Sequence, residues 1–278
     1  MKKALGIILL GALAPFLGVS QEQPVQTFKD TRIVNGHSVE TSFQGEMKFI
    51  ISHRFGMING GAYELFGLDQ STIRLGLDYG LTDKLTVGIG RSSFEKTVDG
   101  FVKYRALTQQ ISGGSPVSVT GLATIAVKGI RFEDPEIENF FTSRLYYAYQ
   151  ILIARQFHDR FSLQAMPSLV HRNLVPTVDD AHDVYALGSA FRFQLTKQVA
   201  IQAEYYWLPP GQVSGDYHSP VSVGFDVETK GHVFQFHLSN STGMIEKFYI
   251  TETRGLWQEG DIHFGFNITR DFRIRGRK

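Results

Sequence analysis

A histidine and a serine stand two residues apart in the sequence His237-Leu-Ser239-Asn240. On an extended strand, residues two apart project from the same face, because successive side chains alternate between the two faces. A serine hydroxyl beside a histidine imidazole is the arrangement of a nucleophile activated by a general base. The spacing therefore allows nucleophilic catalysis by Ser239 with His237 as the base. No third side chain that would orient the histidine can be identified, and a polar strand face explains the same two residues.

Charged side chains form a second group, because they occupy alternate positions inside stretches that are otherwise rich in apolar residues. On a strand they would share one face, which is the polar one. If they line a water-filled lumen, that lumen conducts ions with a mild preference for anions. If they pair across a narrow lumen, they fill it instead. The group comprises eight bases and five acids: Glu46, Lys48, Arg54, Arg74, Asp78, Lys103, Arg105, Lys128, Arg144, Arg192, Glu204, Asp226 and Glu228.

Two acidic groups in irregular stretches could offer oxygen ligands to Ca²⁺. They are Asp179, Asp180, His182 and Asp183 in one stretch, and Glu133, Asp134, Glu136 and Glu138 in the other. Neither group has the spacing of an EF-hand loop, and acidic loops are typically solvated. The nine histidines are scattered through the chain without metal-binding spacing. We therefore expect no metal site and no cofactor.

The composition excludes several further classes of protein. The chain has 28 Lys and Arg residues against 27 Asp and Glu residues, so it lacks the basic surplus that binding to nucleic-acid phosphates requires. It contains no cysteine, which excludes disulfides, thiolate metal sites and cysteine nucleophiles.

The elements that carry these residues repeat with a period of two. In residues 72–81, for example, Leu75 and Leu77 alternate with Arg74 and Asp78, which is the periodicity of a strand. About twelve such segments recur, most of them about nine to thirteen residues long. Strands of soluble sandwiches typically have about five or six residues, whereas a tilted strand needs about nine to eleven to cross a bilayer. The segments begin near Glu46, Thr72, Leu85, Phe101, Pro116, Thr142, Phe161, Asp183, Val199, Val221, His232 and Asp261.

Short and long connections between these segments alternate along the whole chain. The short ones are 81–84, 109–115, 157–160, 196–198 and 229–231. The long ones are 55–71, 91–100, 129–141, 172–182, 209–219 and 240–260. Short periplasmic turns at one rim and long extracellular loops at the other are typical of outer-membrane barrels. Because backbone groups inside a bilayer must all be paired, the sequence predicts an all-β, closed antiparallel transmembrane β-barrel of about 12 strands.

The N-terminus has the three parts of a secretory signal peptide. Lys2 and Lys3 precede an apolar run at 4–17, and the small residues Gly18 and Ser20 follow it. This pattern predicts cleavage near Ser20 and export to the outer membrane of a Gram-negative bacterium.

The chain then divides into three parts. We expect a signal peptide at 1–20, a polar N-terminal segment at 21–44 and the outer-membrane barrel at 45–278. The polar segment is either a periplasmic tail or a short plug, and its sequence does not distinguish the two.

Several motifs together resemble an uncharacterised family of bacterial outer-membrane β-barrels, catalogued as a domain of unknown function. The resemblance covers nearly the whole mature chain. It implies a barrel in the outer membrane and no particular activity. The motifs are HRFG at 53–56, YGLTDKLTVGIGRSSFEK at 79–96, VHRN at 170–173, EYYW at 204–207, GHVFQFHLSNS at 231–241 and GDIHFGFNITRDF at 260–272.

The stretch that begins at His237 is also similar to the His-x-Ser-Asn core of outer-membrane phospholipase A. Two departures weaken this resemblance. Ser241 stands where the phospholipase motif has glycine. The catalytic pair of that family faces lipid, whereas alternation with Phe236 and Leu238 places His237 and Ser239 on the lumen face.

The sequence thus favours a porin-like passive channel for small solutes. Its partners would be outer-membrane lipid and the solutes in its lumen, with no nucleic acid and no identified protein partner. The alternatives are a non-conducting barrel that is structural or binds a partner, and an outer-membrane lipid hydrolase that uses His237 and Ser239.

Overall fold

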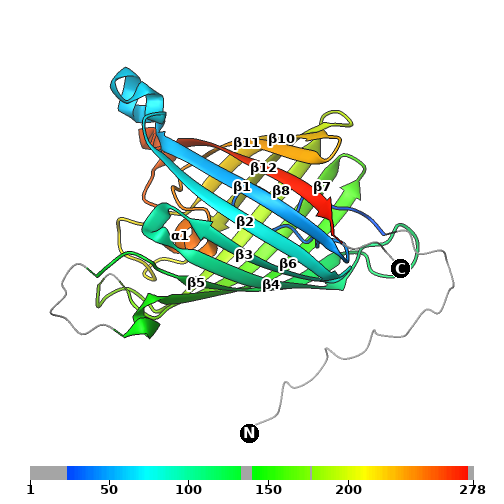
Figure 1. Ribbon diagram of the computed structural model, residues 1–278, viewed down its shortest axis with the longest axis horizontal. Helices are drawn as coiled ribbons and strands as arrows, with labels where there is room; N and C mark the ends of the chain where they lie inside the picture. Colours follow the sequence, from blue (N-terminus) through cyan, green and yellow to red (C-terminus); the bar gives the residue numbers. More distant parts are fainter. Residues whose placement is uncertain (1–23, 133–139, 176, 275–278) are drawn as a thin grey trace, which may run out of the picture.

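The computed structural model describes residues 24–132, 140–175 and 177–274. The expected signal peptide at 1–20 and the acidic group at 133–138 lie outside these residues. Within the described residues, twelve antiparallel strands close into one barrel, in which β1 pairs with both β2 and β12 (Figure 1). Every other strand pairs with its neighbours in chain order. The predicted fold class is therefore confirmed.

The strands begin within three residues of the positions expected from the sequence. Their bounds are β1 Glu46–Met57, β2 Ser71–Thr82, β3 Leu85–Ser92, β4 Val98–Leu107, β5 Ser118–Val127, β6 Leu145–His158, β7 Phe161–Arg172, β8 Asp183–Gln194, β9 Val199–Trp207, β10 Val221–Thr229, β11 His232–Ser239 and β12 His263–Arg273.

The helices all belong to the longer connections, which gather at the left end of the barrel in Figure 1. We call this end the outer end, and we call the end with the short turns the inner end. None of the helices in the described residues has the length and apolar character needed to cross a membrane as a helix. The helices are η1 Ile58–Gly67, η2 Phe94–Lys96, η3 Phe141–Arg144, α1 Glu246–Thr251 and η4 Trp257–Glu259.

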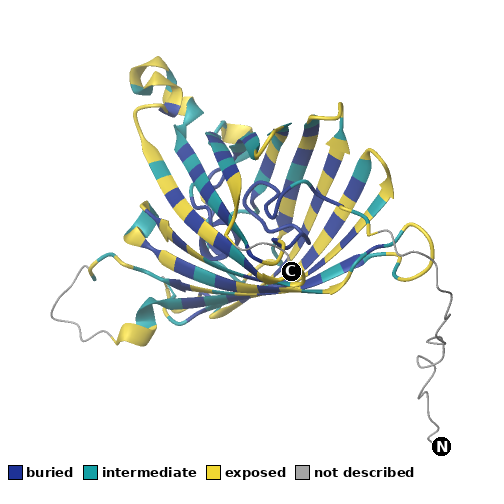
Figure 2. Cartoon of the chain, turned by 45° about the vertical axis from the view of Figure 1, so that its right-hand side comes forward, coloured by how far each residue is buried: buried dark blue, intermediate teal, exposed yellow. Residues whose placement is uncertain are grey.

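Exposed and buried residues alternate along the strands, as the banding in Figure 2 shows. The outward set is apolar: Leu77 of β2 lies level with Phe49 of β1 and Ile89 of β3. This apolar belt is the surface that a barrel presents to lipid. The inward set is buried, so the interior of this barrel is filled.

Two segments from outside the strands fill the interior. One is residues 24–44, here called the lumen hairpin, and the other is residues 240–262, here called the inner loop, which carries α1 (Figures 1 and 2). Small inward residues on β6 and β8 leave space for them. The resulting core joins both segments to the wall: Phe28, Ile33, Val34, Val39, Tyr249 and Ile250 pack with Ala148, Leu152, Met166, Ala186, Ala190 and Tyr206.

Candidate functional site

The lumen hairpin enters at the inner end and turns back near the middle of the barrel. The amide N–H of Val25 donates to the main-chain oxygen of Gln109 at 2.9 Å, in one of the short connections. The hairpin closes where the N–H of Ile33 donates to the oxygen of Gly36 at 2.8 Å and that of Ser38 donates to Thr31 at 3.0 Å. Residues 33–36 therefore form its tip.

One carboxylate of the wall holds this tip. Glu204 of β9 accepts the amide N–H groups of Val34, Asn35 and Gly36 at 3.3, 2.8 and 3.0 Å. Both oxygens of this carboxyl group accept hydrogen bonds, so Glu204 satisfies all three N–H groups of the turn. A Cβ on Gly36 would lie 2.4 Å from the hydroxyl oxygen of Tyr206, so the tip fits only without a side chain there.

Uncharged polar side chains of the wall also bind the main chain of the hairpin. They project from strands around most of the barrel. The bonds are Gln202 to the Ile33 oxygen (2.6 Å), Gln235 to the Ile33 oxygen (2.9 Å), Asn267 to the Val34 oxygen (2.9 Å), Gln164 to the His37 oxygen and from the Val39 N–H (both 2.8 Å), Thr120 to the Val39 oxygen (2.7 Å) and Thr86 from the Ser42 N–H (2.9 Å).

Several of the charged residues singled out in the sequence contact the hairpin. Lys48 lies 2.7 Å from the carboxylate of Asp30, and Arg105 lies 3.4 Å from that of Glu40. Burial raises the pKa of Asp30, but the Lys48 ammonium and the hydrogen bonds to Asp30 outweigh burial, so the pKa lies below its usual value. Lys103 donates to the main-chain oxygen of Thr31 at 3.3 Å.

Other members of that charged group pair within the wall, and several more contact one of the two inserted segments. Arg74 donates to Asp99 at 2.9 Å, and Arg192 lies 3.5 Å from Asp226. The contacts of the remaining members are Arg54 with Asn35 and the Ser241 oxygen, Asp78 with Thr31, Glu228 with Lys29, Glu46 with the Phe43 N–H and Lys128 with Glu95.

Arg144 lies elsewhere than alternation suggests. The sequence places it on the inward face of a strand that begins near Thr142, but β6 begins at Leu145 and Arg144 ends η3. Its guanidinium donates to the main-chain oxygen of Lys128 at 3.0 Å and stacks over the ring of Phe132. These contacts hold it at the outer rim, above the lumen.

The inner loop descends from the outer end and buries α1 inside the wall. The ring of Phe248 packs edge-on against Phe94, with centroids 4.8 Å apart. The ammonium of Lys247 donates to Glu252 at 2.8 Å and to Glu95 at 3.1 Å. The Tyr249 ring lies 5.2 Å from that of Tyr206, the residue that also limits the hairpin tip.

The two inserted segments meet at His37 and Glu246. The Nε2 atom of His37 lies 3.6 Å from Oε1 of Glu246, and both side chains are buried. Burial lowers the pKa of His37 and raises that of Glu246, so burial favours the neutral form of each group. The two inserted segments are therefore in contact inside the barrel, between its two ends.

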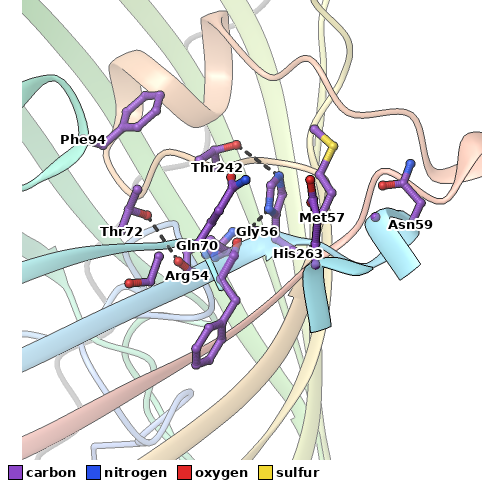
Figure 3. Close-up of a pocket in the computed structure, with 13 residues that line it drawn as sticks. Arg54, Gly56, Met57, Asn59, Gln70, Thr72, Phe94, Thr242 and His263 are labelled. Carbon is purple, nitrogen blue, oxygen red and sulfur yellow. Dashed lines mark hydrogen bonds between the residues drawn. The ribbon is translucent and has the colours of Figure 1, made fainter. Parts of the chain in front are cut away.

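A pocket remains at each end of the closed lumen. The outer pocket has a volume of about 600 Å³ and lies between the end of β1, η1 and the inner loop (Figure 3). His263 borders it and bonds Thr242 at 3.0 Å and the Phe55 oxygen at 2.8 Å. The inner pocket, of about 280 Å³, lies between the hairpin and the wall beside Lys48 and Arg105.

Neither charge nor motif marks the amides that bind the hairpin or the residues of the two inserted segments. Gln164, Gln202 and Asn267 stand at inward positions of the same alternating pattern. They are uncharged, so a search for inward charged residues omits them. The alternating pattern nevertheless places them on the same inward face as the charged residues. No comparable signal marks His37 or Glu246, because neither lies in a strand.

His237 and Ser239 lie on the lumen face, but they do not form a nucleophile and base pair. The Ser239 hydroxyl bonds the Ser222 hydroxyl at 2.9 Å and accepts the Ser241 N–H at 3.1 Å. Neither ring nitrogen of His237 has a hydrogen-bond partner within the described part of the chain. The geometry therefore gives no support to lipid hydrolysis.

Replacing Ser239 with alanine tests this interpretation. We expect the wild type and the Ser239→Ala variant to release fatty acid from phospholipid micelles equally slowly, at the rate of buffer alone. Faster release by the wild type that disappears in the variant would instead assign Ser239 a nucleophilic role.

The acidic residues that follow β7 form hydrogen bonds with other residues of the chain. Asp180 accepts the Ser214 N–H at 2.8 Å and the Thr177 hydroxyl at 2.7 Å, and Asp183 bonds His171 at 2.7 Å. His182 bonds the main-chain oxygen of Arg172. Across residues 24–132, 140–175 and 177–274, no cluster of these residue types is arranged to hold a metal ion.

Comparisons with known proteins agree with this architecture. The family model described as "Membrane bound beta barrel domain (DUF5777)" matches residues 28–272. No curated protein matches the chain by sequence. The NanC porin is similar in fold, with a TM-score of 0.50 and 8% identity over 81% of this chain and 98% of that one.

Two further solved structures have lower scores. The KdgM porin has a TM-score of 0.48 and 9% identity, and the match covers 82% of this chain and 99% of that one. Outer membrane phospholipase A from Escherichia coli has a TM-score of 0.46 and 11% identity, and the match covers 82% of this chain and 91% of that one.

Proposed function

Since this chain belongs to that family of membrane-bound β-barrel domains, we propose that it is a porin-like channel of the outer membrane, closed here by the lumen hairpin and the inner loop. Its solutes are small and polar, and they pass through the lumen when these segments move aside. Cleavage of a signal peptide near Ser20 delivers the chain to that membrane.

The observation that carries this proposal is the space inside the barrel. A barrel filled by its own side chains has no room for additional backbone. This barrel holds both a hairpin and a loop with α1, and both are buried against the wall. The wall by itself therefore encloses a lumen wide enough for solute and water.

The character of the contacts supports reversible closure. Hydrogen bonds and ion pairs to inward side chains hold part of the hairpin, and water and ions can replace these contacts when the segment leaves. Apolar packing of Ile33 and Val39 against the wall holds the rest. The strand ladder closes through β1 and β12 without a contribution from either segment. The barrel can therefore remain folded in both the closed and the open state.

Single-channel recording of the refolded full chain in a planar bilayer tests the proposal. We expect long silent periods interrupted by current steps whose size increases with salt concentration. Heat-modifiable migration on a gel establishes that the protein is folded. A folded protein that stays silent at every voltage, and in variants with displaced segments, would identify the non-conducting structural barrel as the correct alternative.

Ion selectivity gives an independent prediction. Lys103 and Arg105 place two positive charges on the inward face of β4, beside the hairpin. Replacing both with glutamine is expected to reduce the preference of the open channel for anions, measured as a shift of the reversal potential in a salt gradient. Lys84→Gln removes a charge from an exposed short turn and serves as the control. An equal shift in the control would place the conducting path outside this lumen.

A further inference from the structure

The bonds between the wall and the hairpin reveal what the lumen can bind. Most of them join inward side chains to main-chain groups of the hairpin, as described above for Glu204, Gln164, Gln202 and Asn267. Main-chain groups are the same in every peptide, so a surface that pairs with them recognises a polypeptide as such.

Gln164 is the clearest example of this mode of recognition. Its carboxamide donates to the oxygen of His37 and accepts the N–H of Val39, both at 2.8 Å. A neighbouring β-strand presents the same donor and acceptor to residues two apart. The carboxamide of Gln164 therefore takes the place of the N–H and C=O groups of one residue in a neighbouring parallel strand.

Charge adds a second requirement near the inner end. Lys48 binds the carboxylate of Asp30, and Arg105 lies beside that of Glu40. Both bases border the inner pocket of about 280 Å³, which leaves space next to the hairpin. A ligand that replaces the hairpin would meet these two positive charges with its own acidic side chains.

We infer that the lumen wall is a binding site for oligopeptides that carry acidic side chains, and that the hairpin occupies this site as an internal ligand. This inference rests on the proposed channel and names the class of its solute. The wall pairs with the peptide main chain through Glu204 and the inward amides, and with its carboxylates through Lys48 and Arg105.

A full-length variant makes the site accessible without changing the wall. Gly36→Val introduces a side chain that collides with Tyr206, so it displaces the hairpin and leaves all the wall residues intact. The probe is a fluorescent synthetic peptide with the sequence of residues 28–42. Its binding to the variant in detergent is measured by fluorescence anisotropy, and its effect on current is measured in a planar bilayer.

Two modified peptides separate the two parts of the recognition. A peptide N-methylated at Asn35 and Val39 loses the N–H groups that Glu204 and Gln164 accept, and we expect at least tenfold weaker binding. A peptide with Asn and Gln in place of Asp30 and Glu40 loses both carboxylates, and we also expect about tenfold weaker binding.

A pair of wall variants supplies the matched control. Gln164→Ala removes two bonds to the hairpin main chain and should weaken peptide binding about tenfold. Gln150→Ala removes an equally buried inward glutamine whose amide bonds Ser168 of the wall, and it should leave binding unchanged.

The possible outcomes distinguish this inference from the proposed channel. Peptide binding together with current that the peptide blocks supports both. Peptide binding to a barrel that conducts no current supports the proposed binding site and contradicts the proposed channel function. Current without peptide binding, or equal binding of the N-methylated peptide, overturns the binding site and keeps the channel.

Discussion

Replacing Gly36 with valine is expected to make the channel open much more often than the wild type. The first carbon of the new side chain would lie 2.4 Å from the Tyr206 hydroxyl oxygen and 3.2 Å from Oε2 of Glu204. Relieving this overlap requires the hairpin tip to withdraw, because Tyr206 is fully buried in the wall. Overpacking of this kind costs about 1–3 kcal/mol, which corresponds to a shift of the closed-to-open equilibrium of about five- to 150-fold. Single-channel recording measures the open probability directly.

The matched control is Gly215→Val. Gly215 lies in an exposed stretch between β9 and β10, and a Cβ there meets no heavy atom of the described chain within 4 Å. We expect its channel activity to equal that of the wild type. A Gly36→Val protein that is folded but as silent as the control would show that the hairpin tip does not determine closure.

Linking the hairpin tip to the wall is expected to have the opposite effect, which is a large decrease in the frequency of channel openings. The Nδ2 atom of Asn35 donates to the hydroxyl oxygen of Ser222 at 3.0 Å, so thiols at these positions lie within reach of a short bifunctional reagent. The chain has no cysteine, so Asn35→Cys with Ser222→Cys introduces its only two thiols. We expect the bridged protein to open at least about tenfold less often than the same protein before bridging, because a covalent link prevents the tip from leaving.

Each single-cysteine variant, treated with the same reagent, controls for the chemical modification itself. These proteins carry the reagent at one position but keep a mobile hairpin, so their openings should persist. Unchanged openings in the bridged protein would mean that solute passes beside a hairpin that never moves. The closed state described here would then already be the conducting one.

The strands could be predicted because each must satisfy two environments at once. In β2, Leu75 and Leu77 face outward while Arg74 and Asp78 face inward, and this requirement leaves a period of two in the sequence. The alternation of short and long connections then assigns the two rims. At Arg144 the same reasoning fails. The alternating pattern predicts a strand that begins near Thr142, whereas β6 begins at Leu145 and Arg144 belongs to η3.

The content of the lumen could not be predicted in this way. Residues 24–44 have no regular period, and their partners are distant in sequence: Val34 and Asn267 are 233 residues apart. Inward charges on the wall could be identified, but the partners of Lys48 and Arg105 could not, since these partners belong to the hairpin, which has no regular pattern. The small inward side chains of Ala148 and Ala186 make room for the hairpin, yet they carry no polar or bulky apolar signal.

The position of Asp30 has a consequence for the order of assembly. Its carboxylate contacts Lys48 of β1 and accepts a hydrogen bond from Thr269 of β12 at 2.6 Å, so it bridges the seam where the first and last strands meet. Neither the seam nor this bridge can form until β12 has been synthesised and has paired with β1. Asp30 is synthesised more than two hundred residues before β12. Asp30 therefore completes its contacts only after the last strand has joined the barrel, although it lies near the N-terminal side of the first strand.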